Sequence, residues 1–215
     1  MKLSESKIIK TLNSLATVAL IFYGIFLLAN LCGTGIPKAG KGVKSYMIYN
    51  VKVIDDNSNQ KIDHLKIWFN NNLVISETDR ALIHLRFKNY IDLFSLPALI
   101  FQLVQFLYWL SIGFLLWLIK RFFRSLCKNE VFSQKNASTL MFGSLLLIWL
   151  PIIRWFSQEL FINCIEQLHL NDSSYALANG ESLLGSETFI GLALFAFGLA
   201  FRAGVDMKKE NEAFI

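Results

Sequence analysis

The sequence predicts an all-α membrane protein with four transmembrane helices and a small antiparallel β-sheet in the first extracytoplasmic loop. The chain of 215 residues is 54% hydrophobic and only 17% charged, a balance far from that of soluble globular proteins. Four apolar stretches also follow one another along the chain. Each is close to or above the roughly 20 residues that a helix needs to cross a hydrocarbon core.

The first apolar stretch, residues 12–31, contains no charged side chain and is too long for the apolar region of a cleaved signal peptide. The other three cover residues 93–119, 140–162 and about 183–205. We therefore divide the chain into four parts: an N-terminal stub with the first span (1–32), an extracytoplasmic β-cap (33–92), spans two to four (93–205) and a cytoplasmic tail (206–215). The third part includes a cytoplasmic loop at 120–138 and an outer loop at 163–187.

Positive charge is distributed unevenly between the loops. Five Lys or Arg residues lie in the link 120–138, whereas the loop 163–187 has none. Cytoplasmic loops carry an excess of Lys and Arg. We therefore expect both termini in the cytoplasm, in a chain that crosses the bacterial cytoplasmic (inner) membrane several times.

The first outer loop is long enough to fold. Segments 45–54, 64–69, 72–76 and 81–88 are rich in β-branched and aromatic residues and are separated by turn formers. Apolar and polar residues alternate in 64–69 and 81–88, which is typical of strands with one buried face. We predict a small antiparallel sheet that packs on its own connections or on the outer helix ends.

The loop also contains GTGIPKAGKG, residues 33–42, which resembles a phosphate-binding loop without its final Ser or Thr. Such a loop needs a strand in front of it, but here an apolar span precedes it. We interpret it as an exit linker and predict no nucleotide. His64 and His84 lack further spaced ligands, and the chain has no G-x-S-x-G or H-E-x-x-H motif. We expect no enzyme activity, no metal and no cofactor.

Polar residues within the spans allow two interpretations. Gln102 and Gln105 in the second span lie at a depth similar to that of Arg154 in the third. The three could meet across a helix interface and serve a transport path or a switch. In the alternative, which we favour, Arg154 extends outward toward Glu159 and the headgroups while the glutamines tie helices together.

Two further features concern helix neighbours. Cys32 and Cys164 both fall at outer helix ends and could form a disulfide if the first and third spans are neighbours, with two free or buried thiols as the alternative. Ala196, Ala200 and Gly204 recur every four residues in the fourth span, the small-xxx-small pattern. We expect this stripe to pack within the chain, with self-association to a homo-oligomer as the alternative.

Two cytoplasmic segments resemble a known family. NEVFSQKNASTL, residues 129–140, precedes the third span, and FRAGVDMKKENEAFI, residues 201–215, follows the fourth. They are similar to the bacterial four-span membrane family catalogued as domain of unknown function 2975, whose members share Phe-Ser/Thr-x-x-Asn and Phe-Arg/Lys-x-Gly before a Glu-rich tail. The family's usual Thr near the end is replaced by Phe214. The matching residues are Phe132, Ser133, Asn136, Phe201, Arg202, Gly204 and Glu210.

The resemblance implies a partner but no chemistry. Genes of this family often neighbour small helix-turn-helix transcription regulators, which implies that its members hold or modulate a cytoplasmic DNA-binding protein. The segment KRFFRSLCK, residues 120–128, includes Phe123 and Arg124 and could lie on lipid or accept a partner helix. Ser133 is expected to cap the third span.

We therefore expect a non-enzymatic sensor or anchor that binds and modulates a cytoplasmic partner such as a small helix-turn-helix regulator. In this hypothesis the outer sheet receives a signal and the helix packing transmits it. The alternative is a small transporter, channel or membrane-permeability factor. The expected partners are the lipid bilayer and the regulator, without direct contact to nucleic acid.

Overall fold

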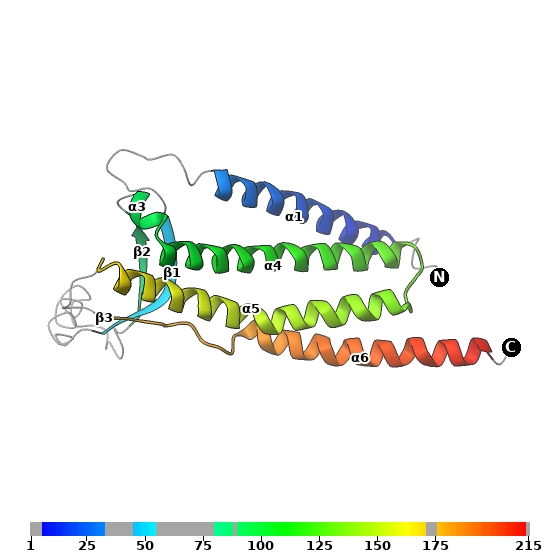
Figure 1. The fold of residues 1–215 in the computed structure, drawn as a ribbon. Coiled ribbons are helices and arrows are strands. Elements are labelled where there is room, and N and C mark those ends of the chain that lie inside the picture. The colour runs from blue at the N-terminus through cyan, green and yellow to red at the C-terminus, as the bar shows by residue number, and fades with distance from the viewer. Residues whose placement is uncertain (1–5, 33–44, 55–79, 88–89, 171–175, 214–215) are drawn as a thin grey trace, which may run out of the picture. The chain divides into compact units, whose positions relative to one another are not determined.

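A computed structural model describes residues 6–32, 45–54, 80–87, 90–170 and 176–213 of the chain (Figure 1). These residues form four long helices, each long and apolar enough to cross a membrane. The predicted four-span helical fold is confirmed, and the chain is a multi-pass membrane protein. A short helix, α3 (Tyr90–Leu93), precedes the second long one. The long helices are α1 (Lys7–Cys32), α4 (Leu96–Cys127), α5 (Gln134–Gln167) and α6 (Ser186–Ala213).

The surfaces of α1 and α4 are apolar. In the most apolar stretch of each helix only 6% of the residues are buried within the protein. Phe22 and Leu103, for example, are both exposed by more than half. A large apolar patch of this kind is rare on a soluble monomer, whereas lipid tails are as apolar as these side chains. The exposed faces of these helices are therefore lipid-facing surfaces.

The chain divides into two compact units, and α4 and α5 each contribute residues to both. The first, here named the helical unit, comprises Met1–Gly33, Gln105–Ile153 and Leu183–Ile215. The second, the sheet unit, comprises Thr34–Val104 and Arg154–Ser182. Each unit has packing contacts of its own.

A three-stranded antiparallel sheet lies among the described residues of the sheet unit. Its central strand, β1 (Ser45–Ile54), pairs on one side with β2 (Arg80–Arg86) and on the other with β3 (Ala176–Ala178). β1 and β2 correspond to the predicted strands 45–54 and 81–88. β3 comes from the loop between α5 and α6, where we predicted no strand, so the sheet joins two loops that are far apart in sequence. The predicted strands 64–69 and 72–76 lie outside the described residues, as do residues 33–42 and His64.

Aromatic side chains form the core of the sheet unit. The Phe161 ring lies 4.7 Å from that of Phe101 and 6.2 Å from that of Phe87, measured between ring centroids. Phe87 directly follows β2, Phe101 lies in the first turns of α4, and Phe161 lies in the last turns of α5. The core therefore fixes both helix ends to the sheet strand. Its buried members are Phe87, Leu93, Ala98, Phe101, Phe161, Cys164 and Ile165.

In the helical unit, Tyr23 attaches α1 to α4. Its hydroxyl donates a hydrogen bond of 2.6 Å to the carbonyl oxygen of Trp109. The tyrosine ring occupies the space that a side chain at position 113 would need, because a Cβ on Gly113 would lie 3.0 Å from Cε1 of Tyr23. Phe26 adds an edge-on contact to Trp109, with ring centroids 5.4 Å apart. A glycine on α4 thus admits a tyrosine from α1.

Helix α6 packs on α5 through two buried glycines, Gly191 and Gly198. A Cβ on Gly191 would lie 2.9 Å from the carbonyl oxygen of Ser144 and 3.0 Å from the amide nitrogen of Ile148. Both atoms belong to the α5 backbone, so they cannot move aside as a flexible side chain can. The two helix backbones approach closely because residue 191 has no side chain.

The predicted small-residue stripe lies on another part of α6. Ala196 and Ala200 are exposed, and only Gly204 faces a neighbour within the chain, the ring of Phe132. The packing face of α6 therefore differs from the one we expected, because glycines seven residues apart give a closer approach than alanines four residues apart. Self-association through Ala196 and Ala200 stays a prediction.

We expect Gly191→Ala to lower the free energy of unfolding by roughly 1–3 kcal/mol, the usual cost of overpacking a close contact. The matched control is Gly24→Ala in α1, where an added Cβ would meet nothing within 4 Å. This control should be neutral or slightly stabilising because alanine favours helix. Unfolding in mixed detergent micelles measures both variants. Equal stability of the two would contradict the close α5–α6 contact.

Candidate functional site

One end of the helical unit collects segments from all four long helices. The Sγ atom of Cys127, the last residue of α4, lies 4.0 Å from the carbonyl oxygen of Ile9 in α1. Phe132, just before α5, stacks on Phe201 of α6. The two segments that resemble the family, 129–140 and 201–215, are therefore brought to the same end in their described parts. We name residues 128–133 the junction loop.

The junction loop leaves α4 through a left-handed residue. Asn129 has a φ of 61°, a conformation that asparagine tolerates better than most residues. The amide of Glu130 donates to the carbonyl of Ser125, and the amide of Asn129 donates to that of Leu126. These two bonds form a Schellman motif, which satisfies carbonyls that the helix end leaves without partners. The exit direction of the loop is thus set by its own backbone.

The loop enters α5 through a cap. Ser133 Oγ accepts a hydrogen bond of 3.3 Å from the backbone amide of Asn136, which confirms Ser133 as the N-cap. The Asn136 side chain is buried, and its Nδ2 group donates to the carbonyls of Glu130 at 2.6 Å and Val131 at 3.0 Å. An amide offers two hydrogens where a carboxylate offers none. Asn136 therefore holds the junction loop against the start of α5.

Phe132 connects the junction loop to α6. Its ring lies 5.2 Å from that of Phe201 with an angle of 21° between the planes, a stacked arrangement. A Cβ on Gly204 would lie 3.7 Å from the Phe132 ring, so that ring also covers the glycine. The Phe of one family-like segment thus contacts both the Phe and the Gly of the other. Phe132 nevertheless stays 54% exposed.

The other residues predicted to bind a partner differ in how exposed they are. Arg124, Arg202 and Glu210 are exposed, as is Met207 of α6, which we did not predict. Phe123 is half-buried, and its ring lies 6.0 Å from that of its neighbour Phe122. Ser133 and Asn136 are occupied in capping the helix. The structure therefore separates the predicted set into residues that build the junction and residues that remain accessible on it.

We expect Asn136→Asp to lower the free energy of unfolding by roughly 1–3 kcal/mol, because the carboxylate leaves two loop carbonyls without donors. Asn129→Asp makes the same amide-to-carboxylate change at an exposed residue of the same loop, in a conformation that Asp tolerates. Thermal unfolding of the two variants in detergent measures the difference. A smaller loss for Asn136→Asp than for Asn129→Asp would contradict the role of the buried amide.

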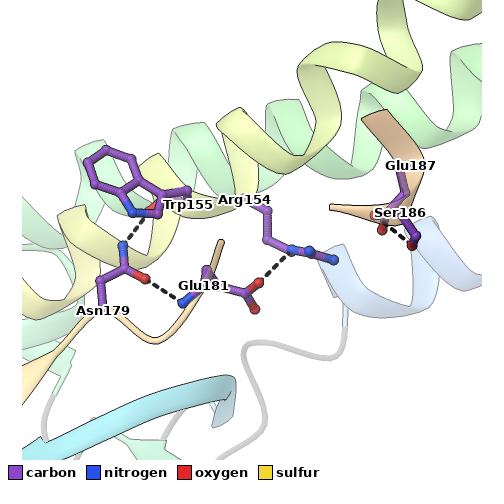
Figure 2. A network of polar contacts seen from close by, with 6 residues as sticks. All are labelled: Arg154, Trp155, Asn179, Glu181, Ser186 and Glu187. Carbon is purple, nitrogen blue, oxygen red and sulfur yellow. Dashed lines mark hydrogen bonds and ion pairs between the residues drawn. The ribbon is translucent and has the colours of Figure 1, made fainter. Parts of the chain in front are cut away.

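The sheet unit contains a polar cluster of its own. It lies where the part of α5 that belongs to this unit begins, at Arg154 (Figure 2). Arg154 Nε lies 3.0 Å from Glu181 Oε2, and the Glu181 side chain is only 5% exposed. Glu181 comes from the segment between β3 and α6. Figure 2 shows the arginine extending from the helix toward this carboxylate. A basic residue in an apolar helix is thus paired with an acid that a loop supplies, as buried charges require.

Asn179 fixes the same segment to the helix. Its Nδ2 group donates to the carbonyl of Trp155 at 2.9 Å and to Glu159 Oε2 at 3.1 Å. Its Oδ1 atom accepts a hydrogen bond of 3.0 Å from the backbone amide of Glu181 (Figure 2). One asparagine therefore aligns the glutamate that pairs with Arg154. The cluster attaches the segment after β3 to α5.

The Arg154 partner differs from the one in the interpretation that we favoured. Arg154 pairs with Glu181, while Glu159, toward which we expected it to extend, accepts the hydrogen bond from Asn179. Gln102 donates to the carbonyl of Leu93 at 2.8 Å, a contact within the sheet unit. Gln105 belongs to the helical unit. The predicted grouping of Gln102, Gln105 and Arg154 stays a prediction.

Cys164 carries a free thiol and is buried in the aromatic core of the sheet unit. The predicted disulfide between Cys32 and Cys164 is therefore wrong, and for Cys164 the alternative of a free, buried thiol holds. The side chain of Cys32 lies outside the described residues. Cys127 is also free and half-buried at the end of α4.

Comparison with known proteins supports the family resemblance. The family described as a protein of unknown function (DUF2975) matches residues 60–215, which is most of the chain. The chain belongs to this family. No curated protein and no solved structure matches it. The matched range of the DUF2975 protein contains the junction loop, the Arg154 cluster and all of α6.

We expect Glu181→Gln to lower the free energy of unfolding by roughly 1–3 kcal/mol, because it leaves Arg154 without its carboxylate. This range is below that for a fully buried pair, since the Arg154 side chain is 33% exposed. Glu166→Gln is the matched control, an exposed glutamate on the same helix. A double-mutant cycle with Arg154→Gln measures the coupling. Additive effects would contradict a direct Arg154–Glu181 interaction.

Proposed function

We propose that this DUF2975 protein is a membrane sensor or anchor that binds a cytoplasmic protein at its junction end. The observation that carries the proposal is the contact of Phe132 with Phe201 and Gly204, which unites the two family-like segments in one surface. Phe132 remains about half exposed there, beside a helix that also exposes Met207. Aromatic residues, Met and Arg are enriched at protein–protein interfaces relative to the rest of the surface.

The cytoplasmic location of this end is supported by its charge. An excess of Lys and Arg marks cytoplasmic loops near the ends of spans. Basic residues are concentrated at the start of α1, around the junction loop and in the last part of α6, all of which the contacts of Cys127 and Phe132 bring together. They include Lys7, Lys10, Arg121, Arg124, Lys128, Lys135, Arg202 and Lys209.

Helix length supports access for a partner. Helix α4 has 32 residues and α5 has 34. At about 1.5 Å of rise per residue, each is roughly 50 Å long, which exceeds a hydrocarbon core of roughly 30 Å. Strongly tilted helices would absorb only part of the excess. Each helix is therefore long enough to extend past the hydrocarbon core, and the basic residues 120–128 favour the junction end as the part that does so.

Helix α5 is the proposed route between a signal and the partner. It carries Arg154 and Glu159 of the polar cluster in one part and Asn136 of the cap in another. Pro151, inside the helix, has no amide hydrogen to donate, and such residues are common places for a helix to bend. We propose that a change at the sheet unit alters α5 and so changes which residues the junction loop presents. Two alternative helix packings are the required coupling element.

The proposed partner is a small helix-turn-helix regulator, as the family resemblance implies. A basic and aromatic surface suits an amphipathic partner helix with acidic residues. Transport is a weaker proposal, because the residue that suggested it, Arg154, has a structural role in attaching the segment after β3 to α5.

Photo-crosslinking tests the proposal in intact cells. We expect a crosslinker at Met207 to capture a DNA-binding regulator, identified by mass spectrometry. Phe189 is the matched control, an equally exposed apolar residue in the first turns of the same helix. Capture should weaken on Lys209→Glu, which reverses an exposed positive charge without touching the stacked rings. Equal capture at Met207 and Phe189, or recovery of lipids and copies of this chain alone, would contradict the proposal.

A further inference from the structure

Helix α4 has a cationic groove on one face near its end. The groove is lined by Trp117, Lys120, Arg121 and Arg124 and has a volume of about 290 Å³. Residues three, four and seven positions apart share one face of a helix, so all four side chains are neighbours. The groove is separate from the Phe132–Phe201 contact, which involves none of these residues.

The groove continues an aromatic surface. The rings of Phe114 and Trp117 stack with centroids 5.4 Å apart and an angle of 18°. The guanidinium carbon of Arg121 lies 5.3 Å from the centroid of the Trp117 ring, within range of a cation–π interaction. Along this face the helix thus passes from apolar rings to positive charges. That order is typical of a helix at the boundary between hydrocarbon and headgroups.

The positive charges of the groove lack a counter-charge within the described part of the chain. Among the residues that the structure describes, no carboxylate pairs with Lys120, Arg121 or Arg124. Arg121 and Arg124 are exposed, and Lys120 is half-buried. Like charges on neighbouring positions of a helix repel one another, so an anion placed among them would be bound favourably.

We propose that this groove binds the phosphate headgroup of an anionic glycerophospholipid. The two arginines offer paired N–H donors that match phosphate oxygens, and Lys120 adds a third positive charge. The exposed faces of Phe114 and Trp117 accept the first part of the acyl chains. A soluble anion would use only the cations, whereas a lipid uses both halves of the surface. The site does not depend on the proposed cytoplasmic partner.

Native mass spectrometry of the full chain in detergent tests this site. We expect one dioleoyl phosphatidylglycerol to bind more tightly than dioleoyl phosphatidylcholine. Arg121→Gln with Arg124→Gln should weaken phosphatidylglycerol binding roughly tenfold or more, given the attraction that each basic residue exerts on anionic lipid. The matched control is Lys128→Gln with Lys135→Gln, which removes two exposed charges at the same end but outside the groove. This control should change binding by less than about twofold.

A second pair of variants tests the aromatic half of the groove. Trp117→Leu should weaken phosphatidylglycerol binding a few-fold, whereas Trp117→Phe, which keeps an aromatic ring under Arg121, should restore most of it. Equal losses in the two double variants would show a general effect of charge and overturn the site. Equal affinity for phosphatidylcholine would overturn the anionic headgroup. Displacement of the lipid by millimolar inorganic phosphate would overturn the lipid in favour of a soluble anion.

Discussion

The arrangement of the junction end depends on one buried amide. Asn136 donates two hydrogen bonds to carbonyls of the junction loop, and Ser133 accepts one from the backbone of Asn136. Without these hydrogen bonds, the loop carbonyls between α4 and α5 would have to bind water instead. Because the loop is fixed, Phe132 is directed onto α6. Within the family signature, Ser133 and Asn136 thus position Phe132.

The same principle operates in the sheet unit with charge in place of an amide. Arg154 needs a carboxylate because an unpaired cation in an apolar helix is expensive. Glu181 supplies it, and Asn179 aligns that glutamate through its backbone. The segment that carries both residues also contains β3, which pairs with β1. The pairing of Arg154 with Glu181 is thereby linked to the position of β3 in the sheet. A sensing role for this unit would need such a link between the sheet and α5.

Composition and apolar length were sufficient to predict the four spans, because a membrane helix must be apolar along its whole length. The Ser133 cap was predictable from a local pattern, since a cap involves residues three positions apart. The partner of Arg154 was not, because Glu181 is distant in sequence and looks like any loop glutamate. The packing face of α6 was also missed: several small-residue patterns coexist on that helix, and only the α5 backbone opposite Gly191 selects one. Strand β3, three residues long, carries no periodicity from which it could be read.

The stacking of Phe132 on Phe201 joins the two family-like segments, and a double-mutant cycle measures this contact most directly. Phe132→Leu, Phe201→Leu and the double variant would be compared by their free energies of unfolding in detergent. We expect a coupling energy of about 0.5–1.5 kcal/mol, the usual value for an aromatic pair. Additivity within experimental error would contradict it, and the two family-like segments would then be separate features of the chain.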